Sequence, residues 1–197
     1  MKRRHPPIPR LWLVSDARND ASLEAALAGL PHGSGFIFRH YHLREAERRA
    51  RWRELVRIAR ARGCIAVLAG PARKARGWHA DGCYGPARML SRGPALLRLV
   101  TVHSLRELGQ AQRARADLVL LSPVFPTRSH PGGGTLGPLR FRLLARQGNV
   151  PVIALGGMDA GKARRIGARS WAAIDAFRAP NGGPVIRILD AESPQGA

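Results

Sequence analysis

Two stretches decide the fold: Ala116-Asp-Leu-Val-Leu-Leu-Ser-Pro-Val-Phe-Pro-Thr-Arg-Ser-His-Pro-Gly132 and Val150-Pro-Val-Ile-Ala-Leu-Gly-Gly-Met158. Each begins with an aliphatic run and ends in residues that permit sharp turns. We expect a helix from Pro138 to Gln147, between the two runs. Strands that are apolar almost without interruption are typical of parallel sheets with both faces covered. The segment therefore predicts a strand, a helix and a second, parallel strand.

The same alternation extends outward over the chain. Regular alternation of strands and helices indicates either a doubly wound sheet or a closed barrel. Eight strands favour an α/β fold of the (β/α)8 TIM barrel class, in one domain over residues 1–197. This length is just below the ~200–250 residues usual for the class, so we expect short helices and a last helix truncated by residues 179–184. The expected strands are 11–15, 35–39, 64–68, 78–84, 97–102, 117–122, 150–155 and 170–174; the expected helices are 21–30, 44–62, 104–115, 138–147 and 159–166, with a single turn at 72–76. Ser104 and Glu107 have the spacing of a capping box at the start of one of these helices.

The composition is that of an ordinary globular protein. Apolar residues make up 45% of the chain, which argues against wholesale disorder. No apolar run approaches the ~18 residues that span a bilayer, and the basic start lacks a small-residue cleavage site. Cys64 and Cys83 are too few for a disulfide framework and lack paired metal-ligand spacing. We expect a soluble, cytoplasmic protein with no membrane partner and two reduced cysteines in or near the core.

The net charge of +20 raises the possibility of a nucleic-acid partner, because Lys and Arg gain affinity by displacing phosphate counterions. Nearly all the cations are arginine, however, and alanine and glycine are also abundant, which is typical of GC-rich coding bias. The densest run, from Arg44 to Arg62, has apolar residues at helical spacing. We interpret its arginines as the solvated face of an amphipathic helix. Phosphorylated small molecules, rather than nucleic acid, are the partners we expect for this positive field.

The loop at residues 122–137 is the first candidate site. In barrels of this class the active site lies on the loops that follow the strands. This loop is rich in glycine and proline, and Thr127, Ser129 and His130 could donate hydrogen bonds to phosphate oxygens. A surface loop without a ligand is the alternative interpretation.

Gly156 and Gly157 form the second candidate, between an expected strand and an expected helix. Exposed amides and the helix dipole favour an anion at such a turn, although a tight turn alone also explains two glycines. Phosphates often bind after strands 7 and 8 of these barrels. The two segments together therefore indicate a phosphate site.

These segments resemble the thiamine-phosphate synthase superfamily, which includes thiazole tautomerase relatives. Besides the two stretches quoted above, Val102-His-Ser-Leu-Arg-Glu-Leu108 and Leu136-Gly-Pro138 carry the resemblance. The similarity is specific over residues 97–177 and looser, but in register, before them. It implies a (β/α)8 barrel that joins a hydroxymethylpyrimidine pyrophosphate to a thiazole phosphate, with Mg²⁺, and releases pyrophosphate.

The resemblance also implies roles for individual residues. Arg39 matches an arginine that reaches the pyrophosphate, and Thr101 stands at a serine position near the reacting pyrimidine. With His130 they form the expected catalytic set. The residues expected to bind substrate or its phosphate are His103, Thr127, Ser129, Gly156, Gly157 and Asp175.

Several positions depart from the family pattern. Leu68–Ala69 stands where the family has an Asn–Asp pair that binds Mg²⁺, and Ala87–Arg88 stands near its second metal carboxylate. Mg²⁺ requires hard oxygen ligands, so the metal expected from the family has no carboxylate ligands that we can identify here. Tyr41 and His130 replace lysines, and Asp175 replaces a serine near the final phosphate loop.

Cations are one possible substitute for the missing metal. Arg39, Arg88 and protonated His130 could neutralise the pyrophosphate, because arginine pairs bidentately with phosphate. The tautomerase relatives use a histidine base at the position of Pro123, which this chain lacks. His130 is a candidate replacement base, since its ordinary pKa is near neutrality.

Three functions follow from these observations. The first is synthase-like condensation, supported by the loop and glycine matches. The second is a divergent relative, tautomerase-like or non-catalytic, that binds a thiazole phosphate without synthase activity. Nucleic-acid binding is the third and rests on charge alone. A homodimer is also possible.

Overall fold

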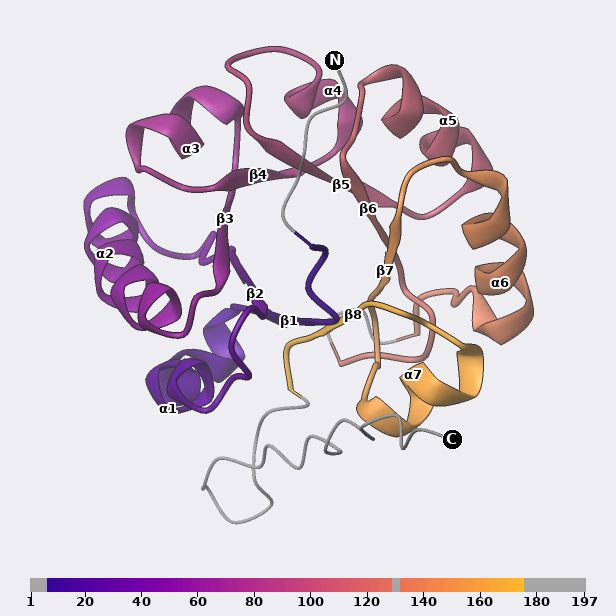
Figure 1. Cartoon of the computed structure of the whole chain (residues 1–197), viewed down its shortest axis with the longest axis horizontal. Coiled ribbons are helices and arrows are strands. Elements are labelled where there is room, and N and C mark those ends of the chain that lie inside the picture. Colours follow the sequence, from indigo (N-terminus) through magenta and orange to yellow (C-terminus); the bar gives the residue numbers. More distant parts are fainter. Residues whose placement is uncertain (1–6, 129–131, 176–197) are drawn as a thin grey trace, which may run out of the picture.

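The chain folds into a closed eight-stranded barrel (Figure 1), seen in a computed structural model that describes residues 7–128 and 132–175. Every strand pairs in parallel with its neighbours in sequence, and β8 closes the ring on β1. The expected (β/α)8 TIM barrel is therefore confirmed. The strands are β1 (Leu11–Val14), β2 (Gly35–Phe38), β3 (Ile65–Ala69), β4 (Gly82–Gly85), β5 (Leu97–Val102), β6 (Leu118–Leu121), β7 (Val152–Ala154) and β8 (Trp171–Ala173).

Short helices surround the ring of strands, as the length of the chain predicts (Figure 1). Only α2 and α6 exceed ten residues within the described ranges. The helices are a 3-10 helix η1 (Ala17–Ser22), α1 (Leu23–Ala28), α2 (Glu45–Ala61), α3 (Ala72–Gly77), α4 (Ala87–Leu90), α5 (Leu105–Arg113), α6 (Gly137–Gln147) and α7 (Ala160–Ile166). The predicted truncation of the last helix falls on residues 179–184, outside the described residues.

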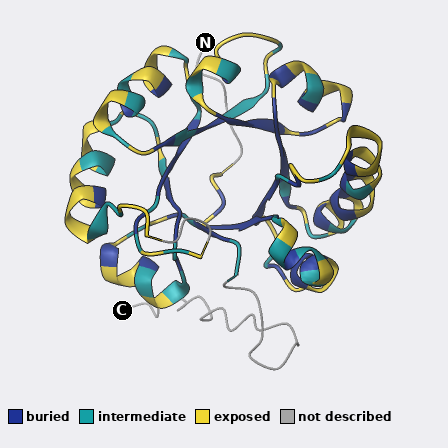
Figure 2. Cartoon of the chain, turned by 180° about the vertical axis from the view of Figure 1, so that it is seen from behind, coloured by how far each residue is buried: buried dark blue, intermediate teal, exposed yellow. Residues whose placement is uncertain are grey.

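Side chains alternate between two apolar layers because successive strand residues point to opposite faces. On β1, Trp12 and Val14 belong to a cluster with members from all eight strands and none from the helices, so it fills the barrel interior. Leu11 and Leu13 belong to the larger cluster between strands and helices. Figure 2 shows the resulting ring of buried strands inside helices with exposed outer faces. Because both faces of each strand are covered, the strands show the uninterrupted apolar runs seen in the sequence.

The structure corrects three local expectations. The segment expected as a strand from residue 78 begins with Trp78, the C-cap of α3, and continues as a turn, and β4 begins only at Gly82. The helix expected at 21–30 begins earlier, as η1, because the Asp16 side chain caps it. The capping box is only half formed: Ser104 accepts a hydrogen bond from the Glu107 amide, but the Glu107 carboxylate accepts one from His103 N at 2.8 Å instead.

One arginine of α2 contradicts the interpretation of that run as wholly solvated. Arg48 is buried, and it donates to the carbonyl oxygens of Arg39 at 3.0 Å and Ala69 at 2.6 Å. It thereby joins the ends of β2 and β3. Both cysteines are free and buried as expected, and burial raises the pKa of each thiol to about 11, so both are protonated at neutral pH.

Candidate functional site

The polar residues singled out in the sequence gather at the carboxyl ends of the strands, which we call the mouth of the barrel. Three groups lie there. One lies at the ends of β1, β2 and β8, another at the ends of β5 and β6, and the third on the loops after β6 and β7. Ser129 and His130 lie outside the described residues, so their predicted roles stay predictions.

The first group is a line of alternating charges. Asp16 accepts hydrogen bonds from Arg39 Nη2 at 2.8 Å and from Arg18 Nε at 3.0 Å, while Arg18 Nη1 lies 3.4 Å from Asp175. Partial burial acts to raise the pKa of Asp16, but the hydrogen bonds and charges of the two arginines outweigh it and hold that pKa below its usual value. Asp16 is therefore ionised at neutral pH, and Arg39 already has an anionic partner.

The side chain of Arg39 is not fully satisfied by these contacts. Within the described part of the chain its buried Nε has no hydrogen-bond partner. Tyr41, at one of the lysine positions of the family, places its ring 5.9 Å from the guanidinium carbon of Arg39 and 5.5 Å from that of Arg48. An aromatic face can stabilise a guanidinium, but it adds no positive charge to the site.

A buried chain of hydrogen bonds, not found from the sequence, fixes the backbone at Arg39. Asp20 accepts from Nε2 of His40 at 2.8 Å, so the neutral ring accepts at Nδ1 from the Ser15 hydroxyl, also at 2.8 Å. Ser15 Oγ in turn accepts from the Arg39 amide at 2.8 Å. Burial lowers the pKa of His40, and the nearby Asp20 only partly opposes this. Because Ser15 is fully buried, the chain positions Arg39 and supplies no nucleophile. In the sequence, only the position of His40 directly after Arg39 hints at this hydrogen-bond chain.

The second group surrounds His103 at the end of β5. The carbonyl of Ser122 lies 2.7 Å from His103 Nδ1, and because a carbonyl only accepts, this nitrogen carries the proton. In the neutral ring Nε2 then has a free lone pair, and the Thr101 hydroxyl lies 3.4 Å from it. The Thr101 hydroxyl can therefore donate to His103 and keep its own lone pairs for a ligand.

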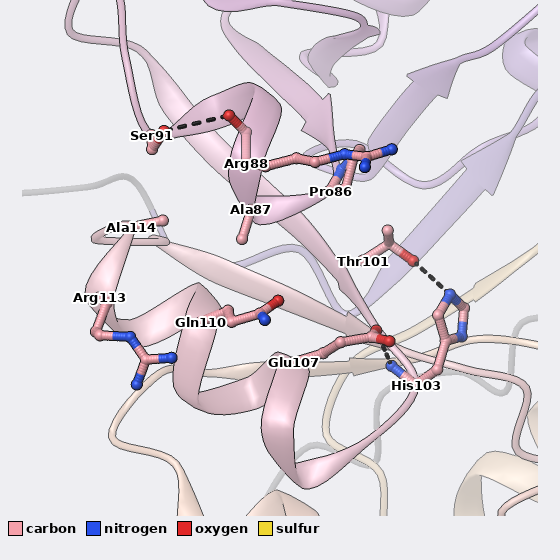
Figure 3. Close-up of a pocket in the computed structure, with 10 residues that line it drawn as sticks. All are labelled: Pro86, Ala87, Arg88, Ser91, Thr101, His103, Glu107, Gln110, Arg113 and Ala114. Atoms are coloured by element: carbon pink, nitrogen blue, oxygen red, sulfur yellow. Dashed lines mark hydrogen bonds between the residues drawn. The ribbon is translucent and has the colours of Figure 1, made fainter.

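Thr101 and His103 open onto a pocket of about 630 Å³ between α4 and α5 (Figure 3). This volume lies within the range of ~300–1,000 Å³ for small-molecule sites. Arg88 lines the same pocket from α4, so a cation accompanies the hydroxyl and the imidazole. The remaining lining residues are Pro86, Ala87, Ser91, Glu107, Gln110, Arg113 and Ala114.

The third group is the turn after β7, on which the loop after β6 lies. Phe125 N donates to the carbonyl of Gly156 at 3.0 Å. A Cβ on Gly156 would lie 2.6 Å from Cα of Pro123, and one on Gly157 would lie 2.4 Å from the carbonyl oxygen of Pro126. Both glycines also have positive φ, at +95° and +60°. The close approach of the two segments therefore requires both glycines, whether or not a phosphate binds at this turn. Thr127 is half-buried on the same loop.

The residues at the mouth do not fit a magnesium ion. Leu68 and Ala69, at the positions of the family's metal-binding pair, are both fully buried apolar residues. The carboxylates of Asp16 and Asp175 are each engaged by arginine. In residues 7–128 and 132–175, no group of three or more His, Cys, Asp or Glu side chains could hold a metal ion. We therefore assign no step to a metal.

A closed parallel barrel with its polar residues at the carboxyl ends of the strands defines a protein of the (β/α)8 class. The sequence model described as thiamine monophosphate synthase matches residues 11–177. The chain belongs to this family, whose members bind phosphorylated small molecules. Of the described helices, none is long and apolar enough to cross a membrane.

Individual relatives agree with this assignment. The chain is 33% identical over 87 residues to an Aquifex aeolicus protein named "Putative thiamine-phosphate synthase 2", a match that covers 40% of this chain and 46% of that protein. Less than half of that relative is thus compared. Thiamine phosphate pyrophosphorylase from Pyrococcus furiosus has a similar structure, with a TM-score of 0.72 and 24% identity over 85% of this chain and 86% of that chain.

The fold is also shared with proteins of other names. The 2-keto-3-deoxy-6-phosphogluconate aldolase of Zymomonas mobilis gives a TM-score of 0.58 at 14% identity, over 90% of this chain and 86% of that chain. At such identities a structural likeness shows the fold alone. The function must therefore be argued from the site.

Proposed function

We propose that this chain catalyses a thiamine-phosphate synthase-like condensation of a hydroxymethylpyrimidine pyrophosphate with a thiazole phosphate. The thiazole nitrogen forms a bond to the pyrimidine methylene carbon, and the bond from that carbon to the pyrophosphate oxygen breaks. Pyrophosphate leaves with the bonding electron pair. Family membership and the name of the Aquifex aeolicus relative support this reaction.

The observation that carries the proposal is the oriented Thr101–His103 pair beside the pocket. With its proton directed at His103, the Thr101 oxygen accepts a hydrogen bond from the pyrimidine and fixes the ring in the pocket. Fixing a reactant in this way lowers the entropic part of the barrier.

The charge that develops on the leaving pyrophosphate needs cations. Arg39 supplies one from the end of β2 and Arg88 a second from α4, with His130 as the expected third. The thiazole phosphate binds at the loop of Thr127 and Ser129 and at the amides of the turn at residues 156–157. Mg²⁺, expected from the family, is part of this proposal only as a variable to be tested.

A second candidate function is binding of a thiazole phosphate without synthase activity, by a divergent or tautomerase-like relative. Two observations favour it: Asp16 occupies Arg39, and the metal-binding pair is replaced by buried Leu68 and Ala69. It requires only the loops after β6 and β7.

The experiment is thiamine phosphate formation from the two substrates, with Mg²⁺ and with chelator, and thiazole phosphate binding by calorimetry. Thr101→Val keeps the shape but removes the hydroxyl, and we expect it to lower kcat about tenfold, roughly the effect of one hydrogen bond. Arg106→Gln, an exposed change on α5, is the control and should leave kcat unaltered. Product that forms with Mg²⁺ but not with chelator means that the metal is recruited with the substrate. Product under both conditions means that the arginines suffice to neutralise the pyrophosphate. Binding without product in either condition establishes the second candidate; absence of binding refutes both.

Three broader predictions accompany this function. We propose that residues 1–197 form one domain, that the protein works in the cytoplasm, and that it forms a homodimer. Limited proteolysis, fractionation and light scattering test these in turn.

A further inference from the structure

The two flanks of α2 carry arginines in opposite electrostatic surroundings. On the side of α1, Arg51 forms ion pairs with Asp20, Glu24 and Glu54. Its pKa is raised, chiefly by the hydrogen bond to Glu24. This flank of the helix is therefore neutralised within the protein.

The flank toward α3 lines a groove of about 410 Å³, which we call the α2–α3 groove. Its exposed cations are Arg49, Arg53, Arg57 and Arg60, and its other lining residues are Trp52, Val56, Gly77, Trp78 and His79. Figure 1 shows α2 and α3 side by side on the outside of the barrel.

No carboxylate balances these cations in the part of the chain that the structure describes. Arg49, Arg53 and Arg57 have no acidic partner there, and Arg60 donates to the carbonyl of His79. The facing helix α3 has the sequence ARKARG, which contains no acid, and its Lys74 is the partner of Glu45. The groove is thus complementary to an anion.

The spacing of the arginines indicates a linear polyanion. At about 1.5 Å of rise per residue, Arg49, Arg53 and Arg57 succeed one another every ~6 Å along one face of α2, and the row to Arg60 extends over about 16 Å. A single phosphate group is too short to meet all four. The two tryptophans of the groove offer no face for stacking, because Trp52 and Trp78 are only 1% and 9% exposed. The exposed side chains of the groove are four arginines and His79, a set that favours contacts with backbone phosphates over stacking on bases.

We propose that the α2–α3 groove binds the phosphate backbone of a single-stranded nucleic acid, without preference for base sequence. A single row of cations follows one strand. The groove lies on the outside of the barrel, along most of α2 and at the carboxyl end of α3, and its lining includes neither Arg39 nor Thr101. Binding here is independent of the proposed condensation.

The test measures how the affinity for a labelled 20-nucleotide single strand depends on salt. Binding is followed by fluorescence anisotropy. Each phosphate contact on a single strand contributes about −0.7 to the slope of log K against log salt. Four contacts give a slope of about −2.8, so affinity should fall about 50-fold between 50 and 200 mM salt. The variant Arg49→Gln/Arg53→Gln/Arg57→Gln should retain one contact, and its affinity should fall only about threefold over the same range.

A variant with the same loss of charge elsewhere is the matched control. Arg106→Gln/Arg164→Gln/Arg169→Gln changes three exposed arginines outside the groove and should keep the wild-type slope. An equal reduction of the salt slope in this control would show that the whole positive surface binds the strand, and it would overturn the proposal. The proposal would also be overturned by absence of binding at 50 mM salt, by a strong effect of base sequence, or by tighter binding of polyphosphate or anionic vesicles than of the strand. Thiamine phosphate formation by the groove variant, measured in parallel, separates this outcome from that of the proposed condensation.

Discussion

Replacing Gly156 with alanine tests how closely the loop after β6 approaches the turn after β7. The new Cβ would lie 2.6 Å from Cα and 2.7 Å from Cβ of Pro123, and 3.1 Å from N of Val124, at a φ of +95°. Two costs add, because an L-residue in left-handed backbone loses about 1–2 kcal/mol and overpacking loses about 1–3 kcal/mol. We expect Gly156→Ala to lower the free energy of unfolding by about 2–5 kcal/mol.

Gly167→Ala is the matched control for this change. Gly167 also has positive φ, at +67°, but a Cβ there would meet no atom within 4 Å. It therefore carries the backbone cost alone. Urea unfolding of both variants, followed by far-UV circular dichroism, gives the two losses, and their difference should be the overpacking cost of about 1–3 kcal/mol. Equal losses would refute the close approach of the two segments, and with it the need for glycine at residue 156.

Three further changes test the mouth of the barrel. Asp16→Asn frees Arg39 and should tighten pyrophosphate binding in calorimetry. Because the pKa of Asp16 is depressed, its ion pairs stabilise the fold at neutral pH, and this stabilisation is lost in acid. The unfolding free energies of wild type and variant should therefore converge below pH ~4. His40 has a depressed pKa, so the unfolded chain takes up its proton first and thermal stability should fall as pH drops below ~6.5, a slope that His40→Gln should flatten. Arg48→Leu leaves the carbonyls of Arg39 and Ala69 without donors, and urea unfolding should show a loss of about 2–4 kcal/mol; a loss no larger than that of Arg49→Leu would contradict this.

The barrel could be predicted because its strands are buried on both faces and so carry uninterrupted aliphatic runs. The prediction failed at residues 78–81, where burial has another origin. Trp78 is 9% exposed because it packs between helices, and its carbonyl accepts a hydrogen bond from Trp52 at 2.9 Å. A buried aromatic residue outside a strand gives the same one-dimensional signal as one inside it. Burial between helices therefore cannot be told from burial in a strand by the periodicity of apolar residues.

Residue types at the mouth could also be predicted, but their partners could not. Thr101 and His103 stand out by position, yet the proton on His103 is fixed by the carbonyl of Ser122, 19 residues away. Every residue has a carbonyl, so no sequence pattern marks that bond. The same holds for Glu107, whose carboxylate reaches the His103 amide instead of the cap residue.

The charges that surround Arg39 at the mouth balance one another. Leu68 and Ala69, at the positions of the family's metal-binding Asn–Asp pair, bring no negative charge to the mouth. Asp16 and Asp175 supply the negative charge, since the line Arg39–Asp16–Arg18–Asp175 contains two cations and two anions. A pyrophosphate that reaches Arg39 therefore competes with Asp16 and does not meet a bare cation. The gain in binding free energy is therefore the difference between pairing Arg39 with pyrophosphate and pairing it with Asp16. For this reason affinity in Asp16→Asn, more than in any variant of Arg39 itself, shows whether the arginine serves the ligand or the fold.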